Sequence, residues 1–346
     1  MPPSVNLFSD TATRPTPAMR RYMCDAEVGD EQRREDPTVN RLQEQVADLL
    51  GKEAALFLPS GTMCNQISFA VHCRAGDEII MDATAHPLNF EGGGPAALAG
   101  ALIRPVNGTR GIFSAEQVEA AIRPRAHFLP RTRAVSVEQT TNIPGGACWP
   151  LEGVRAVTRV AREHGLATHL DGARLPNAVV ATGTGAKDFA EPFDSVWIDL
   201  SKGLGCPVGA VLAGSRDFIE AAWPWKHRLG GAMRQAGIIA AAGIYALEHH
   251  WDRLAEDHAN AKLLADGLAQ VEGIALNPAL VETNIVVFDV QGTGLTGTQF
   301  GDRVREQGVI FSVIGPTTIR AVTHLDVSRA DVAVAVKGVR EALGRR

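Results

Sequence analysis

The sequence predicts an α/β protein, and three features of its pattern support this class. Short apolar segments bounded by turn residues recur along the chain, amphipathic stretches with helical spacing lie between them, and glycines follow several of those stretches. A glycine at that position is typical of a helix end. Alternating strands and helices of this kind build a parallel sheet covered by helices.

The first predicted elements surround a glycine-containing turn. A helix at 38–50 follows Asp36-Pro37, carries apolar residues close to helical spacing, and stops at a glycine. A strand at 54–58 then runs into Pro59-Ser60-Gly61-Thr62, and a helix at 63–73 follows that turn. Further buried strands are expected at 78–81, 134–137, 166–170, 195–200 and 208–213, and further helices at 151–164 and 236–248.

The pattern changes after Leu254, where a smaller α+β domain is predicted. Its expected elements are a helix at 259–271, strands at 284–288, 309–313 and 319–322, and a terminal helix from about Arg329. No linker marks the boundary, which we place near residue 250, inside a helix. A chain of 346 residues also fits about two domains.

Composition and charge exclude several classes of protein. Lysine and arginine number 34 against 39 acidic residues, for a net charge of −5, so there is no basic excess for a nucleic-acid partner. No apolar run is long enough to span a membrane. The five cysteines have no CxxC pair, which argues against a metal site or a disulfide framework. The N-terminus lacks a secretory signal, so a cytoplasmic protein is expected.

Lys202 is the first candidate for chemistry. It follows a predicted buried strand and stands in Ser201-Lys202-Gly203-Leu204-Gly205, where the glycines let a ligand approach closely. This placement suits a lysine that forms a Schiff base. The alternative is a solvated surface lysine, which is the common case at a strand end.

Asp171 and Arg174 emerge together after the strand at 166–170, at the sheet edge where ligands bind in open α/β sheets. A carboxylate near apolar strands is costly unless it meets a cation, and a protonated pyridine nitrogen is such a cation. The alternative is an Asp171–Arg174 ion pair or a turn cap. In the presence of Lys202 we favour the functional interpretation.

The turn Ser60-Gly61-Thr62 lies between a strand and a helix, where free amides and the helix dipole favour a phosphate. An ordinary N-cap is the alternative. His86 also follows a strand, where an imidazole can stack on a flat ring or move protons. We rank His86 above His127, which precedes a strand, and expect His169 to be a core or supporting residue.

Several longer segments, taken together, indicate one family. They are NLFSDTATRPTPAMR, EDPTVNRLQ, GKEAALFLPSGTMCNQ, HLDGARLPNA, SKGLGCPVGAVLAGS, LGGAMRQAG, AAGIYALEHHWDRLAEDHANA and VTHLDVS. Over nearly the whole chain they closely resemble the low-specificity L-threonine aldolases. These are carbon–carbon lyases that depend on pyridoxal 5′-phosphate and cleave L-3-hydroxy-α-amino acids, such as L-threonine and L-allo-threonine, to glycine and an aldehyde.

The resemblance implies an aspartate-aminotransferase-like architecture, called fold type I. A large cofactor-binding domain at 31–250 would hold a mostly parallel seven-stranded sheet, and a smaller α+β C-terminal domain would cover 251–346. An N-terminal segment at 1–30 would join the small domain and a dimer interface. A homotetramer built as a dimer of dimers would share its sites across that interface, with a small amino acid as substrate.

The resemblance also implies roles for single residues. Lys202 would hold the cofactor as a Schiff base, and Asp171 would pair with its pyridinium nitrogen. Gly61 and Thr62 would bind the phosphate, with Arg234 reaching in from a neighbouring subunit. Ser9, Arg174 and Arg320 would hold the substrate carboxylate, with Arg174 also touching the cofactor. His86 would stack on the ring, and the base would be His86, His127 or a water between them.

Some positions differ from the usual family pattern. They are Arg33 and Arg34 where Tyr-Gly is common, Thr141 in EQTTN in place of ENTHN, His227 in place of lysine, and Thr318 in place of arginine. We expect most of them to line or adjoin the site and to affect the preferred side chain and its threo or erythro configuration.

Two alternatives remain open at this stage. One is another pyridoxal-phosphate reaction on the same scaffold, such as β-elimination, aldol transfer, or cleavage of an aryl or α-methyl serine. The other is a catalytically silent metabolite-binding protein that kept the fold, because fold does not imply function. The retained Lys202 argues against the second.

Overall fold

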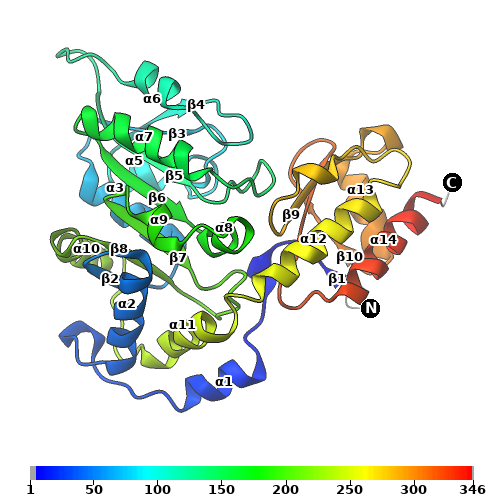
Figure 1. Cartoon of the computed structure of the whole chain (residues 1–346), viewed down its shortest axis with the longest axis horizontal. Helices are drawn as coiled ribbons and strands as arrows, with labels where there is room; N and C mark the ends of the chain where they lie inside the picture. Colours follow the sequence, from blue (N-terminus) through cyan, green and yellow to red (C-terminus); the bar gives the residue numbers. More distant parts are fainter. Residues whose placement is uncertain (1–4, 345–346) are drawn as a thin grey trace.

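A seven-stranded sheet forms the larger part of the protein in the computed structural model, which describes residues 5–344 (Figure 1). The ends of the predicted ranges 1–30 and 251–346 therefore lie outside the described residues. In spatial order the strands are β2 (Ala54–Leu58), β8 (Ala210–Gly214), β7 (Ser195–Asp199), β6 (Ala167–Gly172), β5 (Arg131–Glu138), β3 (Asp77–Asp82) and β4 (Leu102–Val106). Only β8 runs antiparallel to its neighbours in this sheet. The predicted α/β class with a mostly parallel seven-stranded sheet is confirmed.

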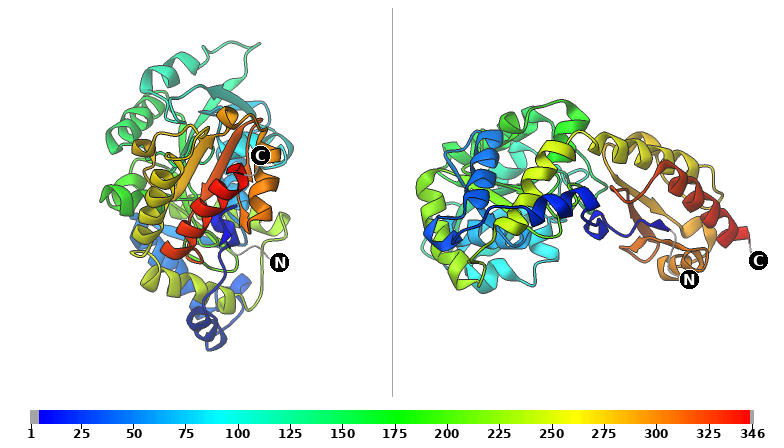
Figure 2. Two further views of the ribbon diagram at one scale, coloured as in Figure 1. Left: turned by 90° about the vertical axis from the view of Figure 1, so that its right-hand side faces the viewer. Right: turned by 90° about the horizontal axis from the view of Figure 1, so that it is seen from below.

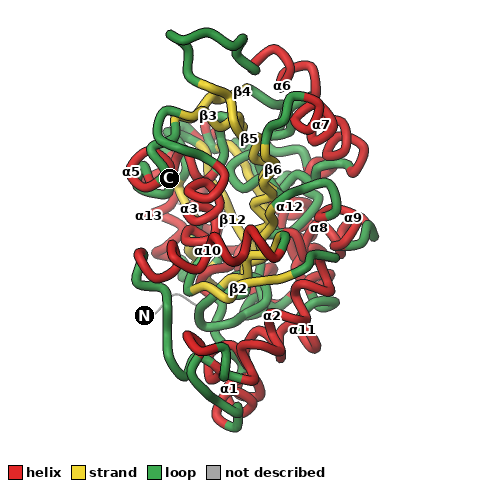
Figure 3. The backbone as a smooth tube through the Cα atoms, turned by 90° about the vertical axis from the view of Figure 1, so that its left-hand side faces the viewer, coloured by secondary structure: helices red, strands yellow, loops and turns green. Residues whose placement is uncertain are grey.

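Helices cover both faces of this sheet. Side chains along a strand point alternately to the two faces, and here apolar side chains lie on both. In β2, Phe57 belongs to the largest apolar cluster, whereas Leu56 and Leu58 belong to a different one. The largest cluster draws on α1 (Pro17–Cys24), α2 (Pro37–Leu50), α6 (Ala115–Ala121), α7 (Leu151–Glu163), α8 (Leu175–Thr182), α9 (Ala186–Ala190) and α11 (Gly237–His249). The other face carries α3 (Gly61–His72) and α10 (Arg216–Arg228), with α5 (Gly94–Leu98) beside α3. Figure 3 shows α5 on one side of the strands and α7 and α9 on the other.

A second apolar cluster gathers the C-terminal elements with the first strand of the chain. The C-terminal elements are α12 (Leu254–Leu268), β9 (Ile285–Asp289), α13 (Gly297–Glu306), β10 (Val309–Ile310), β11 (Ser312–Val313), β12 (Thr318–Val322) and α14 (Arg329–Gly344). β1 (Val5–Asn6) pairs in parallel with β10, and β11, β12 and β9 form an antiparallel sheet. Figure 2 shows this group as a lobe beside the large sheet. The remaining short helices are α4 (His86–Asn89), η1 (Asp10–Ala12), η2 (Glu31–Arg33), η3 (Pro278–Leu280) and η4 (Gln291–Thr293).

Most predicted elements form within a few residues of their expected ends, and the exceptions have physical reasons. The predicted strand at 309–313 is divided, because β10 pairs with β1 whereas β11 pairs with β12. β4 was not predicted; it contains Pro105, which only an edge strand tolerates, and β4 is an edge strand. The expectation that residue 250 lies inside a helix is wrong, since α11 ends at His249 and α12 begins at Leu254. The domain division itself stays a prediction.

Among the described residues, no helix is both long and apolar enough to cross a bilayer.

Asp36 ties three segments of the large part together. It caps α2 by accepting the backbone N–H of Val39 with Oδ1 at 3.0 Å. Its Oδ2 accepts the N–H of Gly29 at 3.1 Å and that of Gly237, at the start of α11, at 2.9 Å. The side chain is fully buried, so water cannot replace it as the partner of these three donors.

We therefore expect Asp36→Ala to lower the free energy of unfolding by about 3 kcal/mol, because α2 loses its cap and two N–H groups, one buried and one half-buried, lose their acceptor. Urea denaturation of the purified protein measures this change. The control is Asp48→Ala on the exposed side of the same helix, where a change below about 0.5 kcal/mol is expected. Equal losses in the two variants would contradict this role for Asp36.

Candidate active site

The candidate residues meet at the carboxyl edge of the large sheet. Asp171 lies near the end of β6, Lys202 follows β7, and His86 follows β3. These three strands are parallel, so their carboxyl ends share one edge. β2 runs in the same direction, because β8 is antiparallel to both β2 and β7, and this brings Gly61 to the same edge.

Lys202 is held by its surroundings rather than extended into water. Its Nζ donates to Asp199 Oδ2 at 2.8 Å and lies 5.6 Å from the centroid of the Trp197 ring. Only 19% of the side chain is exposed. The alternative of a solvated surface lysine is therefore wrong.

Asp171 is a buried carboxylate without a cation directly bonded to it among the described residues. Its Oδ2 accepts from Asn65 Nδ2 at 2.8 Å, and its Oδ1 accepts the N–H of Ala173, a turn contact, at 3.1 Å. Burial raises its pKa, and Glu91 adds to the rise, whereas the Asn65 hydrogen bond and the charges of Lys202 and His86 oppose it. The site therefore favours a cation opposite this carboxylate.

Arg174 pairs with Asp10, so the alternative of an Asp171–Arg174 ion pair is wrong. Its Nε and Nη2 donate to the two oxygens of Asp10 at 2.7 and 2.8 Å. Burial opposes ionisation of Asp10, but the charge and hydrogen bonds of Arg174 outweigh it and hold the pKa of Asp10 well below its usual range. Ser9 precedes this carboxylate, is itself buried, and caps η1.

Arg320 lies beside this pair and shares an acceptor with it. Asn142 Oδ1 accepts from Arg320 Nη1 at 2.7 Å and from Arg174 Nη1 at 3.5 Å. The buried Nε of Arg320 has no partner among the described residues. Burial and then the charge of Arg174 lower the pKa of Arg320 to about 10. Arg174 is paired with a carboxylate, whereas Arg320 donates only to an amide oxygen among the described residues, so the two guanidinium groups leave one positive charge for a further anion.

His86 forms the third part of the site. Its Nδ1 lies 2.9 Å from Glu91 Oε1, and its backbone N–H donates to Glu138 Oε2 at 3.2 Å. Burial alone would lower its pKa, but the bond to Glu91 and the charges of Asp171, Glu91 and Glu138 raise it. Glu138 ends β5, and burial with the nearby Asp171 raises its own pKa to about 8.

The turn at the start of α3 fits the predicted phosphate site. Ser60 caps the helix by accepting the N–H of Met63 at 3.2 Å, as the alternative expected, yet the N–H groups of Gly61 and Thr62 have no partner among the described residues. A Cβ at Gly61 would lie 2.2 Å from the Trp197 ring and 3.1 Å from Asp199 Oδ2. The turn therefore adjoins the Lys202–Asp199 pair.

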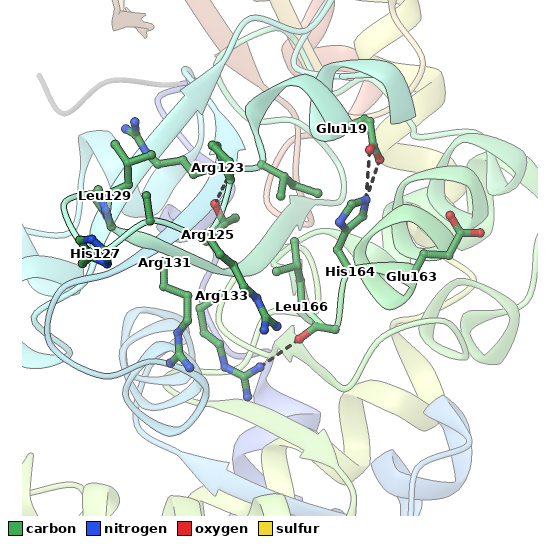
Figure 4. Close-up of a pocket in the computed structure, with 16 residues that line it drawn as sticks. Glu119, Arg123, Arg125, His127, Leu129, Arg131, Arg133, Glu163, His164 and Leu166 are labelled. Carbon is green, nitrogen blue, oxygen red and sulfur yellow. Dashed lines mark hydrogen bonds and ion pairs between the residues drawn. The ribbon is translucent and has the colours of Figure 1, made fainter.

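His127 and Arg234 are not brought to this edge by their own elements. His127 precedes β5 and is exposed at the opposite edge of the sheet, in a pocket lined by arginines such as Arg125 and Arg131 (Figure 4). Within one chain, His127 and His86 therefore lie at opposite edges of the sheet, so a water held between the two is not available there. Arg234 is 63% exposed and donates to Asp30 at 2.9 Å. The roles of both residues stay predictions.

The five departures from the family pattern occupy varied positions. Arg33 and Arg34 form surface ion pairs with Glu35 and Glu220, and His227 is exposed on α10. Thr141 is buried, and its Oγ1 accepts the N–H of Ala147 at 3.1 Å. Thr318 begins β12, two residues before Arg320. Of these, Thr141 and Thr318 stand beside site residues in the chain.

Sequence reasoning missed the partners of the site residues. They are Asp10, Asn65, Glu91, Glu138, Asn142 and Asp199. A signal was present for two of them. Glu138 closes a predicted strand run, and Asn65 puts a polar side chain on the buried side of a helix.

The comparisons with known proteins agree with this geometry. The beta-eliminating lyase family matches residues 6–291. Low-specificity L-threonine aldolase 1 of Arabidopsis thaliana is 43% identical over 98% of this chain and 96% of its own length. The low specificity L-threonine aldolase of Escherichia coli K12 is 40% identical over 99% of this chain and 100% of its own.

Solved structures share the fold. Threonine aldolase of Leishmania major superposes with a TM-score of 0.85 at 19% identity, covering 98% of this chain and 100% of its own. Aspartate aminotransferase of Rhizobium meliloti superposes with a TM-score of 0.73 at 17% identity, covering 99% and 92%.

The fold and the lysine-bearing sheet edge define a fold type I enzyme of the aspartate-aminotransferase type. Within that class, the chain belongs to the low-specificity L-threonine aldolase family. The predicted family resemblance is confirmed.

We expect Gly61→Ala to destabilise the protein by about 1–3 kcal/mol, because the new methyl group must displace the buried Trp197 ring. Thermal unfolding measures the change. The control is Gly153→Ala in α7, where the nearest atom is an ordinary 3.4 Å away and alanine favours the helix. A control that is as damaging as Gly61→Ala would contradict the steric argument.

Glu138 should make stability depend on pH. Its raised pKa means that the folded chain holds a proton that the unfolded chain releases between 4.5 and about 8. The free energy of unfolding therefore falls as pH rises through this window. In urea denaturation across that pH range, the free energy of unfolding of Glu138→Gln should fall less steeply than that of the wild type. The exposed Glu152→Gln is the control, and a Glu138→Gln slope equal to the wild-type slope would contradict the assignment.

Proposed function

We propose that this chain is a pyridoxal-phosphate-dependent carbon–carbon lyase. It cleaves L-3-hydroxy-α-amino acids, such as L-threonine and L-allo-threonine, to glycine and an aldehyde. The observation that carries the proposal is the placement of Asp171 near the end of β6 and of Lys202 just after the neighbouring β7, beside a turn whose two N–H groups have no partner among the described residues. Relatives named as low-specificity L-threonine aldolases, 40–43% identical over almost the full length, support the same reaction.

The residues present fit the cofactor at each of its polar groups. The free N–H groups of Gly61 and Thr62 at the positive end of α3 suit a phosphate. The amine of Lys202 suits an aldehyde. Asp171, buried and lacking a directly bonded cation among the described residues, suits a pyridinium nitrogen. When bound, the cofactor supplies an electron sink for the bond that breaks.

The substrate carboxylate would be held by Arg174 and Arg320, next to Ser9. Arg174 is fixed by Asp10, and the unpaired Nε of Arg320 is a donor that an anion would satisfy. Fixing the carboxylate sets the rotation about the substrate's Cα and therefore selects which bond is broken.

His86 is our first choice for the residue that takes the β-hydroxyl proton. Glu91 holds Nδ1, so Nε2, to which no described residue is hydrogen-bonded, is the nitrogen free to accept it. The neighbouring carboxylates raise the pKa of His86, despite its burial, and make it a stronger base. The same imidazole would face the cofactor ring. His127 remains the alternative base and would have to come from another copy of the chain.

The proposal includes a cytoplasmic homotetramer, arranged as a dimer of dimers. Its support is Arg234, which is 63% exposed and which, by the family resemblance, would complete the phosphate site of a neighbouring subunit. The preferred side chain of the substrate is left to measurement.

Lys202→Ala tests the central assignment. We expect wild-type protein with added pyridoxal phosphate to show a yellow absorbance that borohydride removes, and the variant to lack it and to lose at least about 10³-fold in kcat, since its covalent anchor is gone. Absorbance spectra and glycine release measure this. No absorbance in the wild type, even with excess cofactor, would sink the proposal.

Product analysis separates the competing reactions. With L-threonine, L-allo-threonine, phenylserine and serine as substrates, aldol cleavage releases glycine and an aldehyde. β-Elimination would instead release a keto acid and ammonia. A silent binding protein would release neither.

A further inference from the structure

Asn65 joins two acids of the candidate site through one amide group. Its Nδ2 donates to Asp171 Oδ2 at 2.8 Å and to Glu91 Oε1 at 2.7 Å. The same Glu91 oxygen lies 2.9 Å from His86 Nδ1. Asn65 is fully buried on α3, so no water can substitute for either contact.

The orientation of this amide is fixed by a tryptophan. Trp197 Nε1 lies 2.8 Å from Asn65 Oδ1, and an indole nitrogen can only donate. The contacted atom must therefore be the oxygen, which leaves the NH₂ group for the two carboxylates. His169 Nε2 lies 3.0 Å from the same oxygen and must also donate to it.

This assignment extends along a chain of buried groups. His169 Nδ1 lies 2.8 Å from Ser195 Oγ, which lies 2.8 Å from His72 Nε2. Burial lowers the pKa of both histidines, so both are neutral. His169 Nδ1 therefore accepts from Ser195, and Ser195 accepts from His72. Every donor in the series points toward Asn65, and Asn65 points toward the acids.

We propose that Asn65 is a positioning residue, oriented by Trp197 and His169. It holds the Asp171 carboxylate toward the cofactor's pyridine nitrogen and fixes its position relative to Glu91 and His86. The inference rests on the proposed function. Without the amide, two buried acids would face each other with no shared donor, and their repulsion would turn Asp171 away from its partner.

Asn65→Asp is the sharpest test, because it keeps the shape and the acceptor oxygen and replaces the NH₂ group with a second oxygen, so residue 65 no longer has an N–H donor for each of the two acids. We expect its dissociation constant for pyridoxal phosphate, titrated onto the cofactor-free protein, to rise by about tenfold or more. With saturating cofactor, kcat should fall by a similar factor while KM changes less than about threefold, since the carboxylate contacts of Arg174 and Arg320 are untouched.

Gln66→Glu is the matched control for added charge. Gln66 is the next residue along α3 and donates to the other oxygen of Glu91, but it does not contact Asp171. We expect a smaller loss of cofactor affinity than in Asn65→Asp. Equal losses would show that charge beside Glu91 is enough and would overturn the proposal.

Two substitutions of His169 test the same idea from the far side and serve if the Asn65 variant does not fold. His169→Gln retains an N–H donor toward Asn65, whereas His169→Phe removes it and is otherwise of similar size. We expect His169→Phe to weaken cofactor binding several-fold more than His169→Gln. Equal affinities would overturn the proposal.

Thermal unfolding of the cofactor-free proteins separates positioning from a purely structural role. A structural role would lower the unfolding temperature without changing the affinity of the folded protein for the cofactor, and this result would overturn the inference. A wild type that binds no pyridoxal phosphate would instead contradict the proposed function.

Discussion

The ion pair between Asp10 and Arg174 is the interaction on which the arrangement of the site depends. Both side chains are buried, and both guanidinium contacts are short. Asp10 follows β1, which pairs with β10 of the C-terminal group, and Arg174 follows β6 of the large sheet. Asn284, just before β9, donates to the same carboxylate. Removing either charge would leave the other buried without a partner, which is the costliest way to break such a pair.

The charged side chains of the site fall into two groups of opposite character. On one side Arg174 and Arg320 outnumber the single carboxylate of Asp10, and on the other Asp171, Glu91 and Glu138 gather around His86. The first half favours an anion, such as an amino-acid carboxylate. The second favours a cationic ring and a proton acceptor. In the proposed function, a substrate carboxylate would lie in the first half and a pyridinium cofactor in the second, so charge would favour one orientation of the substrate.

Features set by neighbouring residues could be predicted from the sequence, whereas contacts between distant residues could not. Local patterns identified β2, α2 and the turn before α3, because periodicity and caps are read within a few residues. The partners were missed because they are distant in sequence: Asp10 meets Arg174, and Asn65 meets Asp171. The position of His127 follows from the direction of β5. A residue before a parallel strand lies at the amino edge, away from the residues that follow the strands.

The pairing of β1 with β10 also bears on biosynthesis. Val5 finds its strand partner only at Val309, and Leu7 packs in the C-terminal apolar cluster. A ribosome therefore releases the first strand long before its neighbour exists, and the nascent chain must carry this segment unpaired until almost all of the protein has been made. Contacts that span so much of a chain form late and slowly. The part of the site that contains Asp10, Arg174 and Arg320 is thus completed late in folding, after β1 has met β10.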